Sequence, residues 1–412
     1  MLSKAFWQEF KLLKVFYIWA FIGGLSVFIA PYYTIYFLDI GLSFSQIGLI
    51  FSAVALGTIL FEVPTGAIAD RFGRKLSVVL SWFLTAIIVI LMPFTKSFEI
   101  ILILFFLMSV VSTLASGADQ AWLTDYLKQK RKEDLVHTAL ARRESFLYAG
   151  GVFAFLASGL VVAWLSMSWL WYIQGILMLA TTIFLIRFGK EKFSPKKSNG
   201  IKTDIADTFS DSRKAAVYAG RHKVLLIMVI GSFFAAMASM SSIVWQPYMQ
   251  QLGIQLYLIG PIFALLSVVG MIFSNLSMKY LKLFGSPKRS FIFTVGLEIL
   301  FLVILAYVTS GWLFVILWLI FNSFSFLGWP ISWSYFQRNT PSRIRATMGS
   351  LKSMVSSIGT LIAPAIGGYV ADIYGIRAAI LFSAIFLLPN IFLYSRLDDN
   401  KLKKKPISRK RR

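Results

Sequence analysis

Long apolar stretches alternate with short polar and basic segments along the whole chain. A helix of about 20 mostly apolar residues is long enough to cross the hydrocarbon core of a bilayer. Because backbone N–H and C=O groups find no water there, each stretch must pair them internally as a helix. The pattern predicts an all-α membrane protein with twelve spans, at residues 15–37, 46–68, 76–94, 100–124, 146–166, 168–187, 224–246, 258–280, 289–309, 312–336, 348–371 and 377–396.

The basic residues favour one orientation of these spans. The chain has 41 Lys and Arg residues against 18 Asp and Glu residues, a formal net charge of +23. Of the 41, 39 fall on the side of the membrane that also holds both chain ends, whereas Lys96 and Arg377 fall on the other side. Cytoplasmic loops are enriched in Lys and Arg. We therefore expect a multi-pass protein of the cytoplasmic membrane with both termini in the cytoplasm.

Composition excludes several other classes of protein. Hydrophobic residues make up 58% of the chain and charged residues 14%, whereas soluble proteins have roughly 45–50% and about 25%. The chain has no Cys, which excludes a disulfide scaffold and a cysteine nucleophile. The basic runs lack interleaved aromatic residues, so we expect membrane lipids rather than nucleic acid as partners. No nucleotide-binding or metal-binding motif is present, and we expect no cofactor, no metal and no enzymatic activity.

The chain divides into two similar halves. We expect a six-helix bundle at residues 1–190, a cytoplasmic linker at 191–222, a second six-helix bundle at 223–396 and a basic cytoplasmic tail at 397–412. Gly41 and Gly73 recur 212 residues later as Gly253 and Gly285. Two parallel repeats with a pathway at their interface are typical of secondary transporters.

The loop between the second and third spans carries the most specific motif. Residues 66–75 read G-A-I-A-D-R-F-G-R-K, which closely resembles the signature G-x-x-x-D-R-x-G-R-K/R of the major facilitator superfamily. A generic basic loop would account for Arg71 and Arg74, but not for Asp70 or the two glycines. The resemblance covers the whole chain through span count, repeat and linker. It implies the twelve-helix fold of that superfamily and transport by alternating access.

The resemblance also implies that this loop forms a conformational latch between the halves. Gly66 would let a neighbouring helix approach closely, and Gly73 would permit the tight turn. The Asp70 carboxylate would face the N-terminus of the eleventh span, where unpaired N–H groups favour an anion. Arg74 would pair with Asp125 at the inner end of span four. The expected latch residues are Gly66, Asp70, Arg71, Gly73, Arg74 and Asp125.

Carboxylates inside the spans are candidates for proton coupling, because burying an unpaired charge in a membrane is costly. Asp119 lies within span four, which lines the pathway in this superfamily. One hypothesis is that Asp119 carries the coupling proton and that Arg143 promotes release of this proton. The alternative is that Asp119 forms a structural ion pair with Arg142 or Arg143. Glu62 is the second candidate and alternatively supports the latch. Span nine is peripheral in this superfamily, so we expect Glu298 to take no part in transport.

Aromatic and neutral polar residues on the pathway spans are candidates for substrate contacts. Aromatic rings suit lipophilic or cationic substrates. Interfacial anchoring or ordinary packing is the alternative for each of them. The candidates are Tyr32, Tyr33, Trp122, Trp245, Gln246, Asn322, Trp329 and Trp333.

Together these features predict a secondary transporter that acts as a monomer. The leading hypothesis is proton-coupled efflux of small lipophilic or amphipathic compounds, because the pathway spans are aromatic and poor in charge. A proton-coupled symporter or uniporter for a small metabolite is the first alternative. Drug–proton antiporters of the superfamily carry a Gly-Pro-x-x-Gly-Gly element in span five, and residues 150–159 lack its proline. A receptor or scaffold without transport activity is the alternative from another class.

Overall fold

A computed structural model describes residues 4–191 and 213–398, apart from a few side chains within them, including that of Asp70. The described residues form helices and no strand. The first half contains α1 (Lys4–Leu25), α2 (Tyr33–Asp39), α3 (Phe44–Phe72), α4 (Arg74–Leu91), α5 (Phe98–Thr113), α6 (Ala118–Gln129), α7 (Val136–Trp164) and α8 (Ser168–Phe188). The second half contains α10 (Lys223–Met237), α11 (Trp245–Gln251), α12 (Ile259–Phe284), α13 (Pro287–Tyr307), α14 (Gly311–Asn339), α15 (Arg345–Tyr374) and α16 (Ile376–Ser395).

The twelve predicted spans are confirmed. Twelve segments of the described chain are long and apolar enough to cross a membrane, and each overlaps one predicted span. The two largest differences are at span starts: the fifth span begins at Glu133 rather than at residue 146, and the first span begins at Phe6 rather than at residue 15. The helix continues into this more polar segment because Glu9 is buried there, where it pairs with Arg142 and accepts a hydrogen bond from Tyr17 at 2.5 Å. Residues 213–220, within the expected linker, are helical, and 192–212 lie outside the described residues.

Three spans are interrupted near their middle. The first consists of α1, a 3-10 turn at Ala30–Tyr32 and α2, and the seventh of α10, a 3-10 segment at Ala238–Ile243 and α11. The fourth is broken between α5 and α6, where Gly117 has a φ of 71°. Discontinuous spans are common at the binding sites of transporters, because irregular backbone is tolerated only where it lines a cavity or is covered by protein.

The internal repeat is visible in the backbone. The seven-residue helices α2 and α11 begin 212 residues apart, at Tyr33 and Trp245. Gly41 and Gly253, which follow them, have φ values of 97° and 88°. Gly73 and Gly285 likewise end α3 and α12 with positive φ. Because residues with a Cβ rarely adopt these angles, both repeats depend on glycine at the same two turns.

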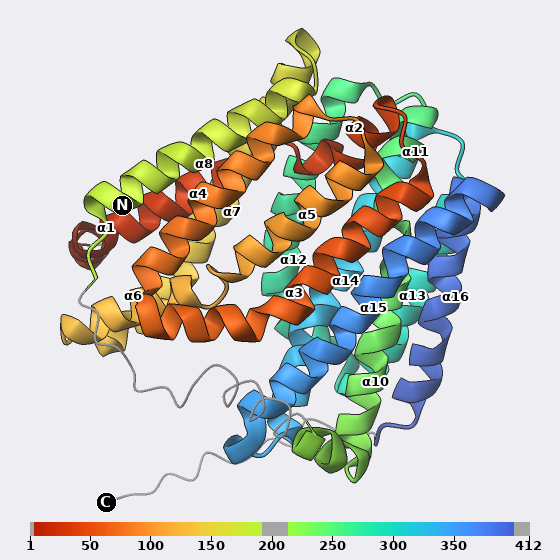
Figure 1. Ribbon diagram of the computed structural model, residues 1–412. Helices are drawn as coiled ribbons and strands as arrows, with labels where there is room; N and C mark the ends of the chain where they lie inside the picture. The colour runs from red at the N-terminus through yellow and green to blue at the C-terminus, as the bar shows by residue number, and fades with distance from the viewer. Residues whose placement is uncertain (1–3, 192–212, 399–412) are drawn as a thin grey trace, which may run out of the picture.

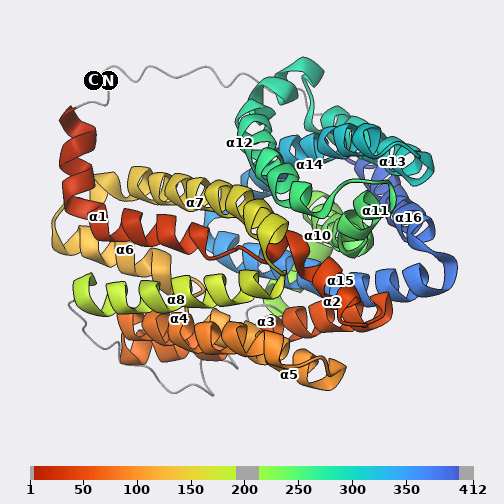
Figure 2. The ribbon, with the colours of Figure 1, turned by 90° about the horizontal axis from the view of Figure 1, so that it is seen from above.

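The helices of the two halves form two groups that meet along two helix pairs (Figures 1 and 2). Across the interface α3 packs against α15, and α7 packs against α12. The short helices α2 and α11 lie at one end of the molecule, at the top of Figure 1. We call this the Gly41 end, and the opposite end, where α3 joins α4, the Gly73 end. The interface between the groups is where a transport pathway is expected.

Candidate transport site

At the Gly41 end the backbones of the two halves touch. A Cβ atom added to Gly48 on α3 would collide with the backbone of Pro364 on α15. One added to Gly368 on α15 would collide with the backbone of Phe44 at the start of α3. Small residues of this kind allow helices in membranes to approach closely. The two helices are therefore in direct contact at this end.

Tyr32 closes the interface between α7 and α12, the second helix pair, at the same end. Its side chain is fully buried, and its hydroxyl oxygen accepts a hydrogen bond of 2.9 Å from the Gly260 N–H in the first turn of α12. A Cβ added to Gly159 on α7 would collide with the Tyr257 carbonyl. Tyr32, predicted to line the pathway, thus joins the two halves in this conformation.

Asp372, which sequence reasoning missed, contributes a further interdomain contact. Its carboxylate lies at the end of α15 and accepts hydrogen bonds from the N–H groups of Phe44, at 2.9 Å, and Ser45, at 2.7 Å. Ser43 and Gln46 form a capping box at the same helix start. The first N–H groups of a helix lack intrahelical partners and carry partial positive charge. An anion from one half therefore caps a helix of the other half.

At the Gly73 end the described atoms leave space beside the two glycines of the corresponding helices. A Cβ added to Gly66 on α3 would meet no atom within 4 Å. One added to Gly349 on α15 would approach only Trp333 and Gln337, which belong to its own half. The side chain of Asp70 lies outside the described residues. Among the described residues, α3 and α15 are in close backbone contact near the Gly41 end, whereas neither Gly66 nor Gly349 contacts the opposite half.

The part of the latch within the first half is assembled. Gly73 joins α3 to α4 with a φ of 108°. Arg74 Nη1 pairs with the Asp125 carboxylate on α6 and donates a hydrogen bond of 2.8 Å to the Ala121 carbonyl. The Arg71 side chain is exposed, with its guanidinium 5.4 Å from the centre of the adjacent Phe72 ring. The structure thus brings Arg74 and Asp125 together.

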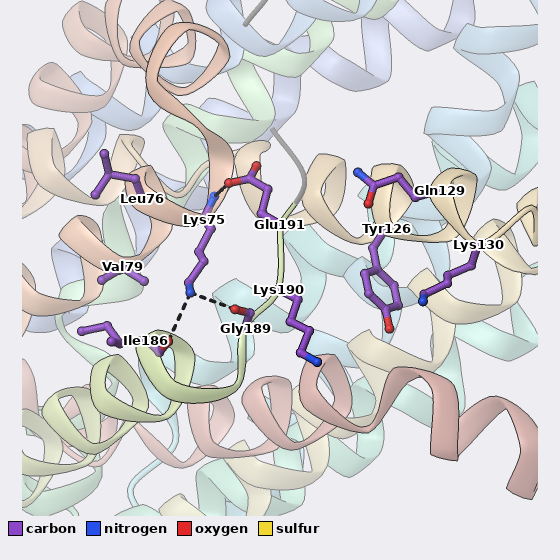
Figure 3. Close-up of a pocket in the computed structure, with 10 residues that line it drawn as sticks. All are labelled: Lys75, Leu76, Val79, Tyr126, Gln129, Lys130, Ile186, Gly189, Lys190 and Glu191. Atoms are coloured by element: carbon purple, nitrogen blue, oxygen red, sulfur yellow. Dashed lines mark hydrogen bonds between the residues drawn. The ribbon is translucent and has the colours of Figure 1, made fainter. Parts of the chain in front are cut away.

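Lys75 and Glu191 attach the motif to the end of the first half (Figure 3). The Glu191 carboxylate accepts hydrogen bonds from the N–H groups of Arg74, at 2.9 Å, and Lys75, at 3.0 Å. Lys75 Nζ donates to the carbonyls of Gly189, at 2.8 Å, and Ile186, at 3.2 Å. An anion at the start of α4 and a cation at the end of α8 both have the sign that the helix dipoles favour.

Asp119 pairs with Arg143, one of the two partners considered from the sequence. Arg143 is 6% exposed, donates a hydrogen bond of 2.8 Å to Glu144, and lies 5.3 Å from the centre of the Trp19 ring. Arg142 pairs with Glu9 instead. Asp119 lies in the first turn of α6, directly after the break at Gly117. A carboxylate that exchanges Arg143 for a proton could couple transport to proton movement.

The other predicted residues of the first half have different surroundings. The Glu62 side chain is exposed, and Ser116 Oγ lies 3.5 Å from its carboxylate. Tyr33 packs against Phe51, Phe105 and Trp171 within the first half.

Trp122 is 2% exposed, contacts the rings of Phe16 and Trp19, and donates a hydrogen bond of 3.1 Å to the Lys190 carbonyl. Its ring is therefore packed inside the first half in this conformation, and a pathway role for Trp122 stays a prediction.

A cavity of about 410 Å³ lies within the second half, between α10, α13, α14 and α16. Three predicted pathway residues, Trp245, Asn322 and Trp329, line it. Trp333 stacks on Trp329, with ring centres 6.4 Å apart and planes 2° apart. The Gln246 side chain is buried, and its Oε1 atom has no hydrogen-bond partner.

Glu298 lines the same cavity. We expected it to lie on a peripheral helix without a part in transport. The face of α13 that carries Glu298 is turned toward the cavity, and the absence of a role in transport stays a prediction.

Comparison with known proteins places this architecture in a family. The sequence profile of the Major Facilitator Superfamily matches residues 15–355 and, in a second match, residues 282–412. The chain belongs to the Major Facilitator Superfamily. It is 26% identical over 402 residues to the "Uncharacterized MFS-type transporter YxaM" of Bacillus subtilis, covering 95% of this chain and 98% of the relative. It is 22% identical over 382 residues to the "Multidrug resistance protein MdtG" of Proteus mirabilis, covering 90% of this chain and 91% of the relative.

The crystal structure of the nucleoside transporter NupG shares the fold of this Major Facilitator Superfamily transporter. The TM-score is 0.78 at 15% identity, and the match covers 93% of this chain and 98% of NupG. The resemblance inferred from residues 66–75 is thereby confirmed. Family and fold identify a multi-pass membrane transporter of small molecules. Within the described residues, no group of three or more His, Asp or Glu side chains could hold a metal ion.

Proposed function

We propose that this protein is a secondary active transporter that exports small lipophilic or amphipathic compounds in exchange for protons. The observation that carries the proposal is the cavity of the second half, which is lined by Trp245 and Trp329 and, among its described residues, by no Lys or Arg. Such walls suit an apolar ligand with few polar groups. The multidrug-resistance name of the Proteus mirabilis relative supports the same substrate class.

The two ends of the interface support alternating access. The positive-inside rule assigns the Gly73 end, with its basic loops, to the cytoplasm. With that assignment, the contacts of Asp372 and Tyr32 would close the outer end, and the space beside Gly66 would belong to an open cytoplasmic side. In the opposite state, Asp70 would face the start of α15 and the contacts at the Gly41 end would part. Asp119, with Glu62 as second candidate, would carry the proton between these states.

The assignment of the Gly73 end to the cytoplasm predicts the accessibility of introduced cysteines. In intact cells, Lys96→Cys and Ser310→Cys should react with a membrane-impermeant maleimide from outside, whereas Lys132→Cys should react only after permeabilisation. All three side chains of the native protein are exposed, and the absence of native Cys removes background labelling. Reaction of Lys132→Cys in intact cells would overturn the orientation.

Transport in proteoliposomes tests the proposed function. Purified protein should move ethidium across the membrane when a pH gradient is imposed, and movement should stop when the gradient is dissipated. The cavity also carries neutral polar groups, among them Asn322 and Ser325, which would suit a hydroxylated metabolite. A panel of nucleosides and sugars is therefore tested in parallel. Uptake of a nucleoside or sugar without movement of ethidium would favour the metabolite transporter and contradict the efflux proposal.

A further inference from the structure

Glu298 is the only charged side chain among the described residues that line the cavity of the second half. Its carboxylate accepts a hydrogen bond of 2.7 Å from Ser325 Oγ on α14. No Lys, Arg or His of the described residues lies within ion-pairing distance of it. A carboxyl group without a cation inside a membrane-spanning bundle is costly to bury in its charged form, which makes it a candidate functional group. The cavity therefore contains a single carboxyl group, and no described cation of the protein pairs with it.

Asn390 provides a second, independent observation in the same cavity. Its side chain is 1% exposed, and its Oδ1 atom has no hydrogen-bond partner. A buried carbonyl oxygen without a donor costs about 1–3 kcal/mol, so most such atoms in proteins are satisfied. A ligand that brings a hydrogen-bond donor or a positive charge would relieve this cost. Asn390 lies on α16 and Glu298 on α13, so two helices contribute acceptor groups to the lining of one cavity, and the Asn390 oxygen has no donor.

Aromatic rings form part of the cavity wall. Trp245, on α11, is 8% exposed and contacts the rings of Phe314, Trp318 and Phe321, which hold it in place. Trp329 is 70% exposed and stands at the rim. The faces of aromatic rings attract organic cations, and Trp does so most strongly. The volume of 410 Å³ falls within the range of small-molecule sites.

We propose that this cavity is a binding subsite for a monovalent organic cation, with its positive group beside Glu298 and Asn390 and its apolar part against Trp245 and Trp329. The subsite rests on the proposed function, because it assigns the charge that the exported amphipathic compound carries. It lies inside the second half rather than at the interface between the halves. A neutral compound of the same shape would leave the Glu298 charge unpaired and would bind less tightly than the cation.

A structural role for Glu298 makes a different set of predictions. In that case the carboxylate only ties α13 to α14 through Ser325, and loss of the hydrogen bond is what matters. Ser325→Ala removes the bond and keeps the charge, whereas Glu298→Gln keeps an acceptor for Ser325 and removes the charge. The two variants therefore separate the roles.

Equilibrium dialysis with the purified full-length protein in detergent tests the subsite. The probes are radiolabelled tetraphenylphosphonium, a monovalent cation, and triphenylphosphine oxide, an uncharged compound of related shape. Glu298→Gln should weaken binding of the cation about tenfold or more and leave binding of the neutral probe within about twofold. Ser325→Ala should retain binding of the cation. Glu99→Gln, the same chemical change at an exposed position of the first half, is the matched control and should bind both probes like the wild type.

Three results would overturn the subsite. They are unchanged cation binding by Glu298→Gln, equal losses for both probes, and a Ser325→Ala defect as large as that of Glu298→Gln. Asn390→Ala, which removes the second acceptor, provides an independent variant and should also weaken the cation selectively. A wild-type protein that transports ethidium in proteoliposomes but binds tetraphenylphosphonium no better than the neutral probe contradicts the subsite alone. A protein that transports no lipophilic compound contradicts the proposed function as well.

Discussion

Asp119→Asn is expected to reduce pH-gradient-driven transport to background while leaving substrate exchange intact. The carboxylate pairs with the buried Arg143 in the described conformation, and proton coupling requires a group that alternates between a cation and a proton. Asn resembles the protonated carboxyl group and cannot release a proton. Transport against a gradient and exchange of substrate at equal concentrations are measured in the same proteoliposomes. The variant should lose the first activity and retain the second.

Glu144→Gln is the matched control for this prediction. Glu144 is the other carboxylate bonded to Arg143, at 2.8 Å. If the carboxylates serve only to neutralise a buried Arg143, both variants should be impaired to a similar degree and in both activities. If Asp119 carries the proton, only Asp119→Asn should separate uphill transport from exchange. Uphill transport by Asp119→Asn at the wild-type rate and with the wild-type pH dependence would transfer the role to Glu62.

Asp372→Asn is expected to open the Gly41 end. The change removes the negative charge at the start of α3 and leaves one acceptor oxygen for the N–H groups of Phe44 and Ser45. An anion at a helix N-terminus contributes about 0.3–1 kcal/mol, and up to about 2 kcal/mol when partly buried. Asp372 contacts α3 only while this end is closed, so removal of its charge destabilises the closed state alone. About 1.4 kcal/mol corresponds to a factor of ten. The equilibrium between the closed and open states should therefore shift about tenfold toward the open state.

The rate of maleimide labelling at Ser158→Cys reports this opening. Ser158 is fully buried at the Gly41 end, where its hydroxyl group lies next to Gly260 of the other half. Labelling should be slow in the otherwise wild-type protein and about tenfold faster with Asp372→Asn. Ser43→Ala is the control, because it removes a cap that α3 supplies to itself in either state. An equal increase in labelling for Ser43→Ala would show that loss of any cap, rather than of the interdomain contact, loosens this end.

The local sequence pattern was sufficient to predict the twelve spans and one ion pair of the latch. Twelve apolar stretches, separated by basic loops, correspond to the twelve observed spans. The motif resemblance predicts that Arg74 pairs with Asp125, and the structure places the two side chains in contact. The spans and the Arg74–Asp125 pair could be predicted because the position of a residue along its span fixes its depth in the membrane.

Contacts that depend on how helices rotate and pack could not be predicted. Asp372 caps a helix start more than 300 residues away, and no local pattern identifies the helix that lies opposite. Glu298 lies on a span that is apolar all around, so its sequence does not show which side faces the bundle. Trp122 lies on a span predicted to line the pathway, but its ring is enclosed by Phe16 and Trp19. Side-chain direction within a bundle is set by tertiary packing.

Distance measurements between spin labels test most directly whether the two ends open in alternation. One pair, Lys96→Cys with Ser310→Cys, spans the Gly41 end, and a second pair, Lys132→Cys with Arg343→Cys, spans the Gly73 end; all four native side chains are exposed. Addition of a transported substrate together with a change of pH should lengthen the distance in the first pair and shorten it in the second. Asp372→Asn should produce the same opposed changes without substrate. Distances that stay fixed in both pairs, or that change in the same direction, would contradict alternating access by these two halves.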